Sequence, residues 1–163
     1  MPSKALAISG GVLALIGFFI PWAFNRNGNM ISGGELFNER ADYGFTVSLA
    51  LFLVLGCLVL SIGLIATANE GRLWMYRAAP VAALFAVIIQ LVLWMQALVD
   101  IGEGWWDITF GLGVFIGAVG DAMLIFGVLG CWVELTIAEE AHARMDVLDD
   151  KLRQIEKDLK KIR

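Results

Sequence analysis

The chain has 163 residues, of which 59% are hydrophobic and 17% are charged, and its formal net charge at pH 7 is −4. A mean hydropathy of +0.76 excludes an ordinary water-soluble domain. An isoelectric point near 4.9 argues against nucleic acid as a partner, so composition indicates a protein whose main partner is the lipid bilayer.

Four apolar stretches are long enough to cross a hydrocarbon core, which takes roughly 20 residues. In chain order they cover residues 5–24, 43–69, 78–99 and 108–133. Lipid does not satisfy backbone polar groups, and these stretches are continuously apolar rather than alternating, so each is expected to be a helix. We therefore predict an all-α integral membrane protein, with a four-helix transmembrane domain in residues 1–137 and a helical tail in residues 138–163.

The first stretch is predicted to be a retained signal-anchor helix. Lys4 precedes it, as in a signal peptide, but the apolar run is longer than the 7–15 residues of a cleaved hydrophobic region and no small-residue cleavage site follows it. Pro21 is expected to mark the end of this helix or a kink near the membrane surface.

The distribution of Lys and Arg predicts the orientation. If the N-terminus is cytoplasmic, Lys4, Arg72, Arg77 and every basic residue of the tail lie inside, whereas the outer loops hold only Arg26 and Arg40. Both termini are then expected in the cytoplasm, with the protein as a multi-pass component of the cell membrane.

Tryptophans near the ends of the spans fit this orientation. Such residues anchor helices at the membrane surface. We expect an outer belt of Trp22, Trp105 and Trp106, and an inner pair of Trp74 and Trp132.

Enzyme chemistry is not expected. The chain has a single histidine, His142, and its two cysteines, Cys57 and Cys131, both lie in predicted spans, so no zinc-site spacing is present. There is no Gly-rich phosphate loop, nucleophile elbow or kinase signature. We therefore predict neither a cofactor nor a metal.

The tail carries a heptad pattern with apolar spacings of 3, 4, 3, 4 and 3, at Met145, Leu148, Leu152, Ile155, Leu159 and Ile162. In a parallel homo-oligomer it would place attractive charges opposite each other, in the pairs Arg144 with Asp149, Lys151 with Glu156, and Asp158 with Arg163. The pattern predicts a parallel coiled coil and favours a trimer or tetramer. The alternative is a single amphipathic helix that lies on the membrane or docks on the protein.

Extending this heptad backwards places four glycines of the last span on the same seam: Gly113, Gly117, Gly120 and Gly127. Small residues let membrane helices approach closely. These glycines are expected either to bring the fourth span near the axis of the oligomer or to pack against the other three helices of the same subunit.

Asp121 is the only charged residue in the four stretches, and it lies near the middle of the last one. An acid at this depth is either protonated and hydrogen-bonded or lines a wet cavity. Candidate partners in the other spans are Ser9, Ser48, Ser61, Gln90 and Gln96. We predict a pore or intramembrane polar site formed by Asp121, Gln90 and Gln96, with a protonated acid that links helices as the structural alternative.

Two resemblances follow from these features. Four spans and a cytoplasmic coiled coil resemble the layout of voltage-gated proton channels and calcium-release-activated channels, but the repeated arginines of a voltage-sensing helix are missing, so voltage gating is not implied. The stretches Phe19-Ile20-Pro21-Trp22, Ser32-Gly33-Gly34-Glu35 and Gly102-Glu103-Gly104-Trp105-Trp106 resemble a pattern of small uncharacterised prokaryotic tetraspan proteins, which implies no activity.

Two functions therefore remain as hypotheses. The first is a homo-oligomeric cation or proton channel with the fourth helix near the oligomer axis and a ring of Asp121 carboxylates. The second is a non-conducting scaffold or accessory subunit that binds other membrane proteins through its outer loop, residues 25–42, and its coiled-coil tail.

Overall fold

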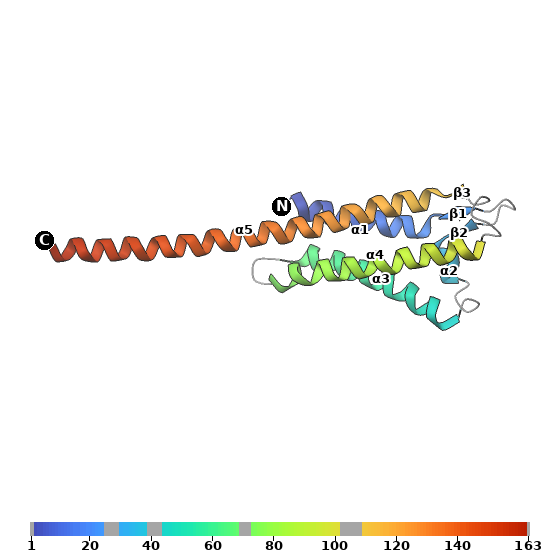
Figure 1. The fold of residues 1–163 in the computed structure, drawn as a ribbon, viewed down its shortest axis with the longest axis horizontal. Helices are drawn as coiled ribbons and strands as arrows, with labels where there is room; N and C mark the ends of the chain where they lie inside the picture. The colour runs from blue at the N-terminus through green and yellow to red at the C-terminus, as the bar shows by residue number, and fades with distance from the viewer. Residues whose placement is uncertain (1, 25–29, 39–43, 69–72, 102–108, 163) are drawn as a thin grey trace.

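A computed structural model describes residues 2–24, 30–38, 44–68, 73–101 and 109–162, and long helices dominate it. They are α1 (Pro2–Phe19), α3 (Gly44–Thr67), α4 (Leu73–Ile101) and α5 (Leu112–Ile162), with a short α2 (Gly33–Asn38) between α1 and α3. Figure 1 shows α1, α3, α4 and the first part of α5 side by side. Within the described residues, these four long helices are long and apolar enough to cross a membrane.

Two helix boundaries differ from the predicted spans. α1 ends at Phe19 rather than at residue 24, because the chain passes through Pro21, which lacks a backbone N–H, and then enters a strand. α4 begins at Leu73 rather than at residue 78, because the intervening turn is apolar except for Arg77, whose side chain is exposed.

A small antiparallel sheet, which the all-α prediction did not include, lies at the end of the bundle remote from the tail (Figure 1). Its strands are β1 (Ala23–Phe24), β2 (Met30–Ile31) and β3 (Thr109–Phe110), in the order β2-β1-β3. In the central strand, Ala23 lies opposite Ile31 of β2 and Phe110 of β3. The sheet therefore joins the end of α1 to the start of α5.

Backbone hydrogen bonds next to the sheet strengthen this connection. The Trp22 N–H donates to the Ile31 carbonyl at 2.6 Å, and the Gly111 N–H donates to the Trp22 carbonyl at 2.7 Å. The Gly113 N–H donates to the Pro21 carbonyl at 3.0 Å. A side chain at Gly111 would collide with the Pro21 carbonyl, so glycine is required for this close approach.

α2 begins with a reciprocal cap. The Glu35 N–H donates to the Ser32 hydroxyl at 3.1 Å, and the Ser32 N–H donates to the Glu35 carboxylate at 3.0 Å. This capping box satisfies two backbone donors at the start of the helix. It explains the Ser-Gly-Gly-Glu sequence as a local structural motif.

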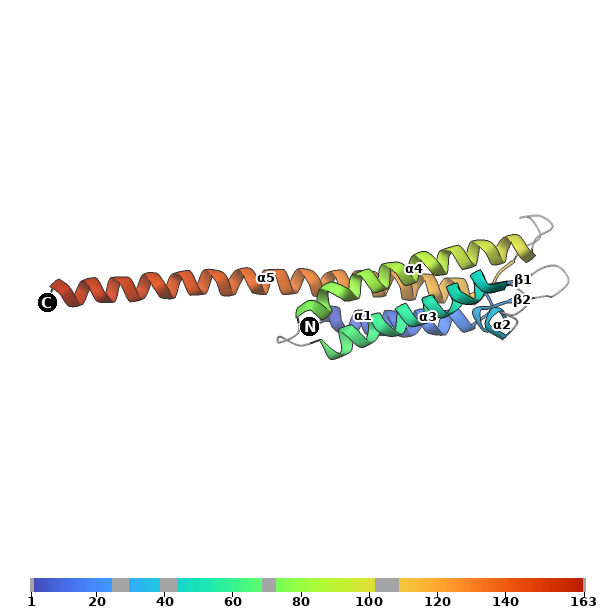
Figure 2. The ribbon, with the colours of Figure 1, turned by 90° about the horizontal axis from the view of Figure 1, so that it is seen from below.

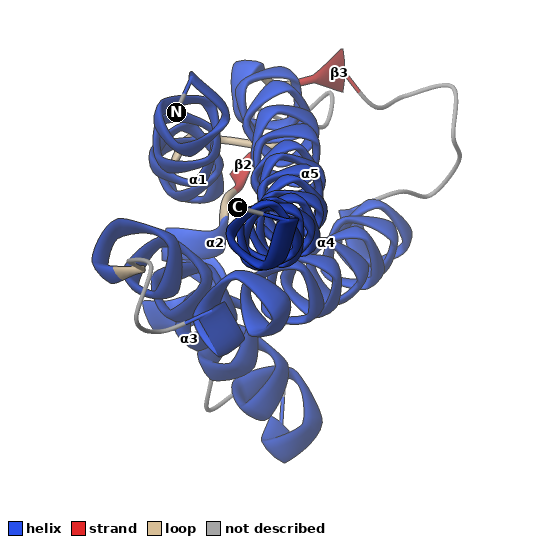
Figure 3. Cartoon of the chain, turned by 90° about the vertical axis from the view of Figure 1, so that its left-hand side faces the viewer, coloured by secondary structure: helices blue, strands red, loops and turns tan. Residues whose placement is uncertain are grey.

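The four long helices form a bundle in which α1 contacts α5 and α3, and α4 contacts α3 and α5 (Figure 3). The contact between α1 and α5 is the most extensive. On the other side, the Ser61 hydroxyl of α3 donates to the Ala79 carbonyl of α4 at 3.3 Å. The bundle thus consists of two closely packed helix pairs placed against each other.

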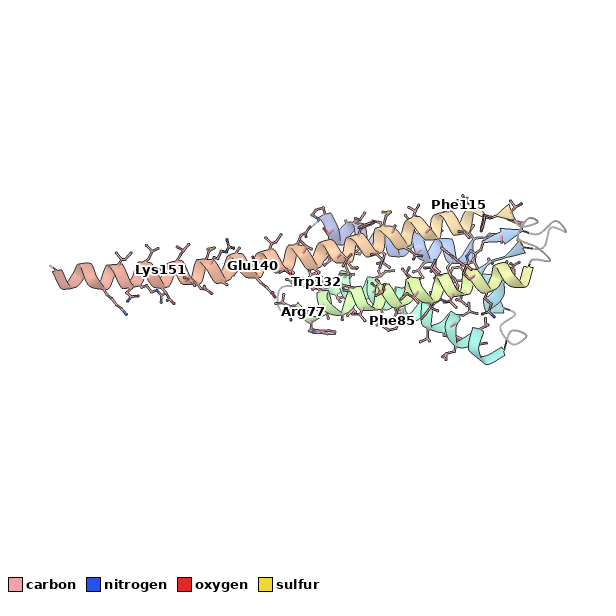
Figure 4. The ribbon with its side chains drawn as sticks, in the orientation of Figure 1. Arg77, Phe85, Phe115, Trp132, Glu140 and Lys151 are labelled. Carbon is pink, nitrogen blue, oxygen red and sulfur yellow. The ribbon has the colours of Figure 1, made fainter. Side chains whose placement is uncertain are left out.

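The outer surface of the bundle is apolar. Large exposed side chains occur on all four helices, among them Phe85 on α4 and Phe115 on α5, both labelled in Figure 4. A monomeric soluble protein rarely exposes a continuous apolar surface of this size. The surface is compatible with contact to lipid.

α5 is one continuous helix of 51 residues, roughly 77 Å long at 1.5 Å per residue. Figures 1 and 2 show that its second part extends far beyond the bundle. No break separates residue 137 from residue 138, so the bundle and the tail share one helix. Arg77 of α4 forms an ion pair with Glu139 of α5 at 3.5 Å, near the point where α5 leaves the bundle.

Candidate functional site

Asp121 forms a hydrogen bond inside the bundle. The Gln90 side-chain amide of α4 donates from Nε2 to Oδ2 of Asp121 on α5 at 3.2 Å. Asp121 is 5% exposed and Gln90 is fully buried. The structure thus selects one of the five polar residues considered as partners and places the pair between two helices of the same chain.

Trp94 and Gly117 lie next to this pair. Gln90 and Trp94 are four residues apart on α4, and Gly117 and Asp121 are four residues apart on α5, so each pair lies on one helix face. A Cβ atom at Gly117 would lie 2.8 Å from Cζ2 of Trp94 and 3.1 Å from Nε2 of Gln90. The absence of a side chain at Gly117 therefore lets the Gln90 amide and the Trp94 ring pack directly against α5.

Three buried polar atoms of this cluster have no hydrogen-bond partner among the described residues: Oε1 of Gln90, Nε1 of Trp94 and Oδ1 of Asp121. Trp94 is 8% exposed, so all three side chains are more than nine-tenths buried. A buried polar atom without a partner costs about 1–3 kcal/mol. We call Gln90, Trp94 and Asp121 the polar cluster.

Gln96, the third residue of the predicted intramembrane site, lies apart from the polar cluster. Its side chain is exposed. Six residues advance an α-helix by roughly 240° beyond a full turn, so Gln96 and Gln90 lie on different faces of α4. The sequence prediction also did not include Trp94. Its position four residues after Gln90, one helical turn further along α4, was the signal that could have placed it in the site.

The predicted glycine seam lies within one chain. A Cβ at Gly120 would meet the backbone of Ala14 on α1, one at Gly127 would meet the backbone of Ala7, and one at Gly113 would meet the carbonyls of Ile20 and Pro21. Of the two arrangements expected for these glycines, the structure thus describes packing against helices of the same subunit. In the single chain, α1 and α4 thus cover this face of α5.

α1 supplies the matching small residues. Gly10 lies against the backbone of α5 at Leu124, and Gly17 lies against the backbone at Gly117. Together with Ala7 and Ala14, they recur at spacings of 3, 4 and 3, which is the same periodicity as the glycines of α5. This spacing in the first span was a sequence signal for close helix packing, but it does not say which helix is the partner.

Trp22 lies in the bundle core and not in the predicted outer belt. It is 1% exposed, and its Nε1–H donates to the Gly17 carbonyl at 3.1 Å. Its ring contacts those of Phe18 and Trp94 edge to face, with centroid separations of 5.4 and 6.2 Å. These contacts hold the indole inside the bundle. Trp105 and Trp106 lie outside the described residues.

Trp74 and Trp132 are exposed near the tail end of the bundle, and Figure 4 labels Trp132 there. Polar contacts occur at the same end. The Ser3 hydroxyl donates to the Glu134 carboxylate at 2.6 Å, and the Lys4 ammonium donates to the Ala68 carbonyl at 3.2 Å. These charged and aromatic residues form a polar boundary between the apolar bundle and the extended tail.

Four of the six heptad residues of the tail are exposed to solvent in the single chain. Met145, Leu148, Leu152 and Ile155 are 56 to 66% exposed. Their spacing places them along one side of α5, which has no contact with the bundle there (Figure 2). The side chains of Leu159 and Ile162 lie outside the described part. An apolar stripe on an isolated helix is a surface that a partner can cover.

Metal binding and homology offer no further assignment. No group of three or more His, Cys, Asp or Glu side chains within the described ranges is placed to hold a metal ion, and the cysteines there are free. A scan against protein-family models and searches of curated proteins and of solved structures found no match to this chain.

Proposed function

We propose that this protein is a homo-oligomeric scaffold or accessory subunit of the cell membrane, with both termini in the cytoplasm. In this proposal the bundle crosses the bilayer and the end of α5 joins copies of the chain in a parallel coiled coil. The single observation that carries the proposal is the continuity of α5, which runs without a break from the bundle into an exposed apolar stripe.

The physical argument starts from the tail. Three heptads are marginal as an isolated coiled coil, because short helices gain little buried surface. Anchoring each tail to a membrane bundle raises the effective concentration of the tails for each other. The proposed trimer or tetramer is then a joint product of tail pairing and membrane confinement.

The bundle favours the scaffold over a pore at the oligomer axis. A ring of Asp121 carboxylates requires this face of α5 to point towards neighbouring subunits. Instead, Asp121 faces Gln90 within the chain, and the glycines on either side of it lie against α1 and α4. Among the described residues, the exposed surfaces left for partners are the apolar outer side of the bundle and the tail.

A charge placed on the stripe tests the proposed assembly. We expect Leu152→Asp together with Ile155→Asp to reduce the oligomer to smaller species in native mass spectrometry and crosslinking, because unpaired charges would be buried at the seam. The matched control is Val147→Asp with Gln154→Asp, which adds the same charge to exposed positions outside the seam. An unchanged oligomer in the first variant, or equal loss in both, would contradict assembly through the stripe.

A cation or proton channel is the alternative function, and the polar cluster is the observation that favours it. An ionisable side chain with an unpaired oxygen inside an apolar bundle is a feature of intramembrane conduction paths. Purified protein in liposomes would then carry protons, monovalent cations or calcium, and Asp121→Asn would abolish the flux while the assembly stays intact. If liposomes with the wild-type protein remain impermeable to protons, monovalent cations and calcium, the channel function is ruled out and the scaffold function is retained.

A further inference from the structure

The unpaired atoms of the polar cluster complement one another. Nε1–H of Trp94 is a donor, and Oε1 of Gln90 is an acceptor. Oδ1 of Asp121 accepts a hydrogen bond when the acid is ionised and donates one when the acid is protonated, because Oδ2 already accepts from Gln90. A molecule that satisfies all three atoms therefore has to accept from Trp94, donate to Gln90 and take either role towards Asp121.

The packing around the cluster restricts the size of such a molecule. A single added carbon at Gly117 would lie 2.8 Å from the Trp94 ring and 3.1 Å from the Gln90 amide. On the adjacent face of α5, Gly120 lies against the backbone of Ala14. On these sides the packing leaves no room for an added carbon atom, which favours the smallest possible guest.

We propose that Gln90, Trp94 and Asp121 bind one water molecule inside the bundle. Water has two donors and two acceptors, so it serves Oδ1 of Asp121 in either protonation state while it accepts from Trp94 and donates to Gln90. Buried waters in proteins make about three hydrogen bonds to groups that would otherwise be unsatisfied. This inference is independent of the proposed scaffold, because it concerns one chain.

The bound water would fix the register of α4 against α5. Both helices are apolar on most sides, so burial alone discriminates weakly between registers. A shift of either helix would separate the three polar groups from their shared water and leave them facing apolar side chains or lipid. The water is thus a positioning element of the bundle, linked directly to two helices.

Nuclear magnetic resonance of the full chain in detergent micelles can detect this water. The indole signal of Trp94 is assigned with the Trp94→Phe variant. Its contact with water is measured as a cross peak in a rotating-frame experiment, where the sign of the cross peak separates dipolar contact from chemical exchange. We expect a dipolar cross peak between water and the Trp94 indole proton. Trp22 is the matched control, because its indole is also buried but donates to the Gly17 carbonyl, and it should show none.

Variants of the cluster provide a second measurement. In Gln90→Leu with Asp121→Leu, two of the three partners of the water are lost, so the Trp94 cross peak should disappear, whereas Asp121→Asn should retain it. A wild-type Trp94 signal without the cross peak overturns the proposal, and so does a cross peak that persists in the folded double variant. If the double variant does not fold, the comparison of Trp94 with Trp22 in the wild type decides alone.

Discussion

Gln90 on α4 and Asp121 on α5 are 31 positions apart in sequence, and a hydrogen bond of 3.2 Å from Nε2 to Oδ2 joins their buried side chains. The pair links the two helix pairs of the bundle by a directional contact, in an interior that is otherwise mostly apolar. In apolar surroundings such a bond contributes about 1 kcal/mol. Its main effect is to specify which faces of α4 and α5 meet.

Asp121→Asn should be tolerated better than Asp121→Leu. The amide preserves the shape and can still accept from Gln90, so we expect a loss of about 1 kcal/mol in the free energy of unfolding. Leucine leaves the Gln90 amide unpaired and should cost about 1–3 kcal/mol. Unfolding by denaturing detergent, followed by circular dichroism, measures both losses. Equal losses would show that the hydrogen bond does not stabilise the bundle.

A double-mutant cycle isolates the contact itself. Gln90→Leu with Asp121→Leu removes both partners, so its loss should be smaller than the sum of the two single losses. Strict additivity would mean that the two side chains do not interact in the folded protein.

Gly120→Ala should separate α1 from α5. The new methyl group would collide with the backbone of Ala14, which has no flexible end that can move aside. Overpacking of this kind costs about 1–3 kcal/mol in the free energy of unfolding. Gly56→Ala on α3 is the matched control, because its Cβ would meet nothing within 4 Å, and it should leave stability unchanged or raise it. Equal effects at both glycines would contradict the close packing of α1 on α5.

Trp22→Phe should destabilise the bundle, whereas Trp74→Phe should not. The first change removes the buried hydrogen bond to the Gly17 carbonyl and its edge-to-face contact with Trp94, and we expect a loss of about 1–3 kcal/mol. Trp74 is exposed, so its replacement should stay within about 0.5 kcal/mol. Thermal unfolding of the two variants under one detergent condition makes the comparison.

Single cysteines test the proposed orientation. In a background without Cys57 and Cys131, a cysteine at Met30 should react with a membrane-impermeant maleimide in intact cells, and one at Ala143 should react only after lysis. Both positions are exposed in the structure, so burial does not limit either reaction. Labelling of Ala143 in intact cells would reverse the orientation.

The sequence by itself determined the helices, because the length of an apolar run and the need to satisfy the backbone within it suffice to predict a spanning helix. Pro21 likewise marked the end of α1 from its own chemistry. The heptad spacing of the tail is a local property too, and α5 is helical throughout that segment. The side-chain partners of the tail remain a prediction, since Leu152 and Ile155 are exposed in the single chain.

Only the tertiary structure decided which faces of these helices meet. In a span that is apolar on all sides, positions that face lipid and positions that face another helix carry the same residue types, so periodicity gives little information. This is why the place of Trp22 in the core, the role of Trp94 beside Gln90, and the packing of Gly120 on Ala14 came from the packed structure. The sequence showed Asp121 as an acid inside an apolar span. Its hydrogen-bond partner, Gln90, lies on a different helix, so only the packed structure identifies it.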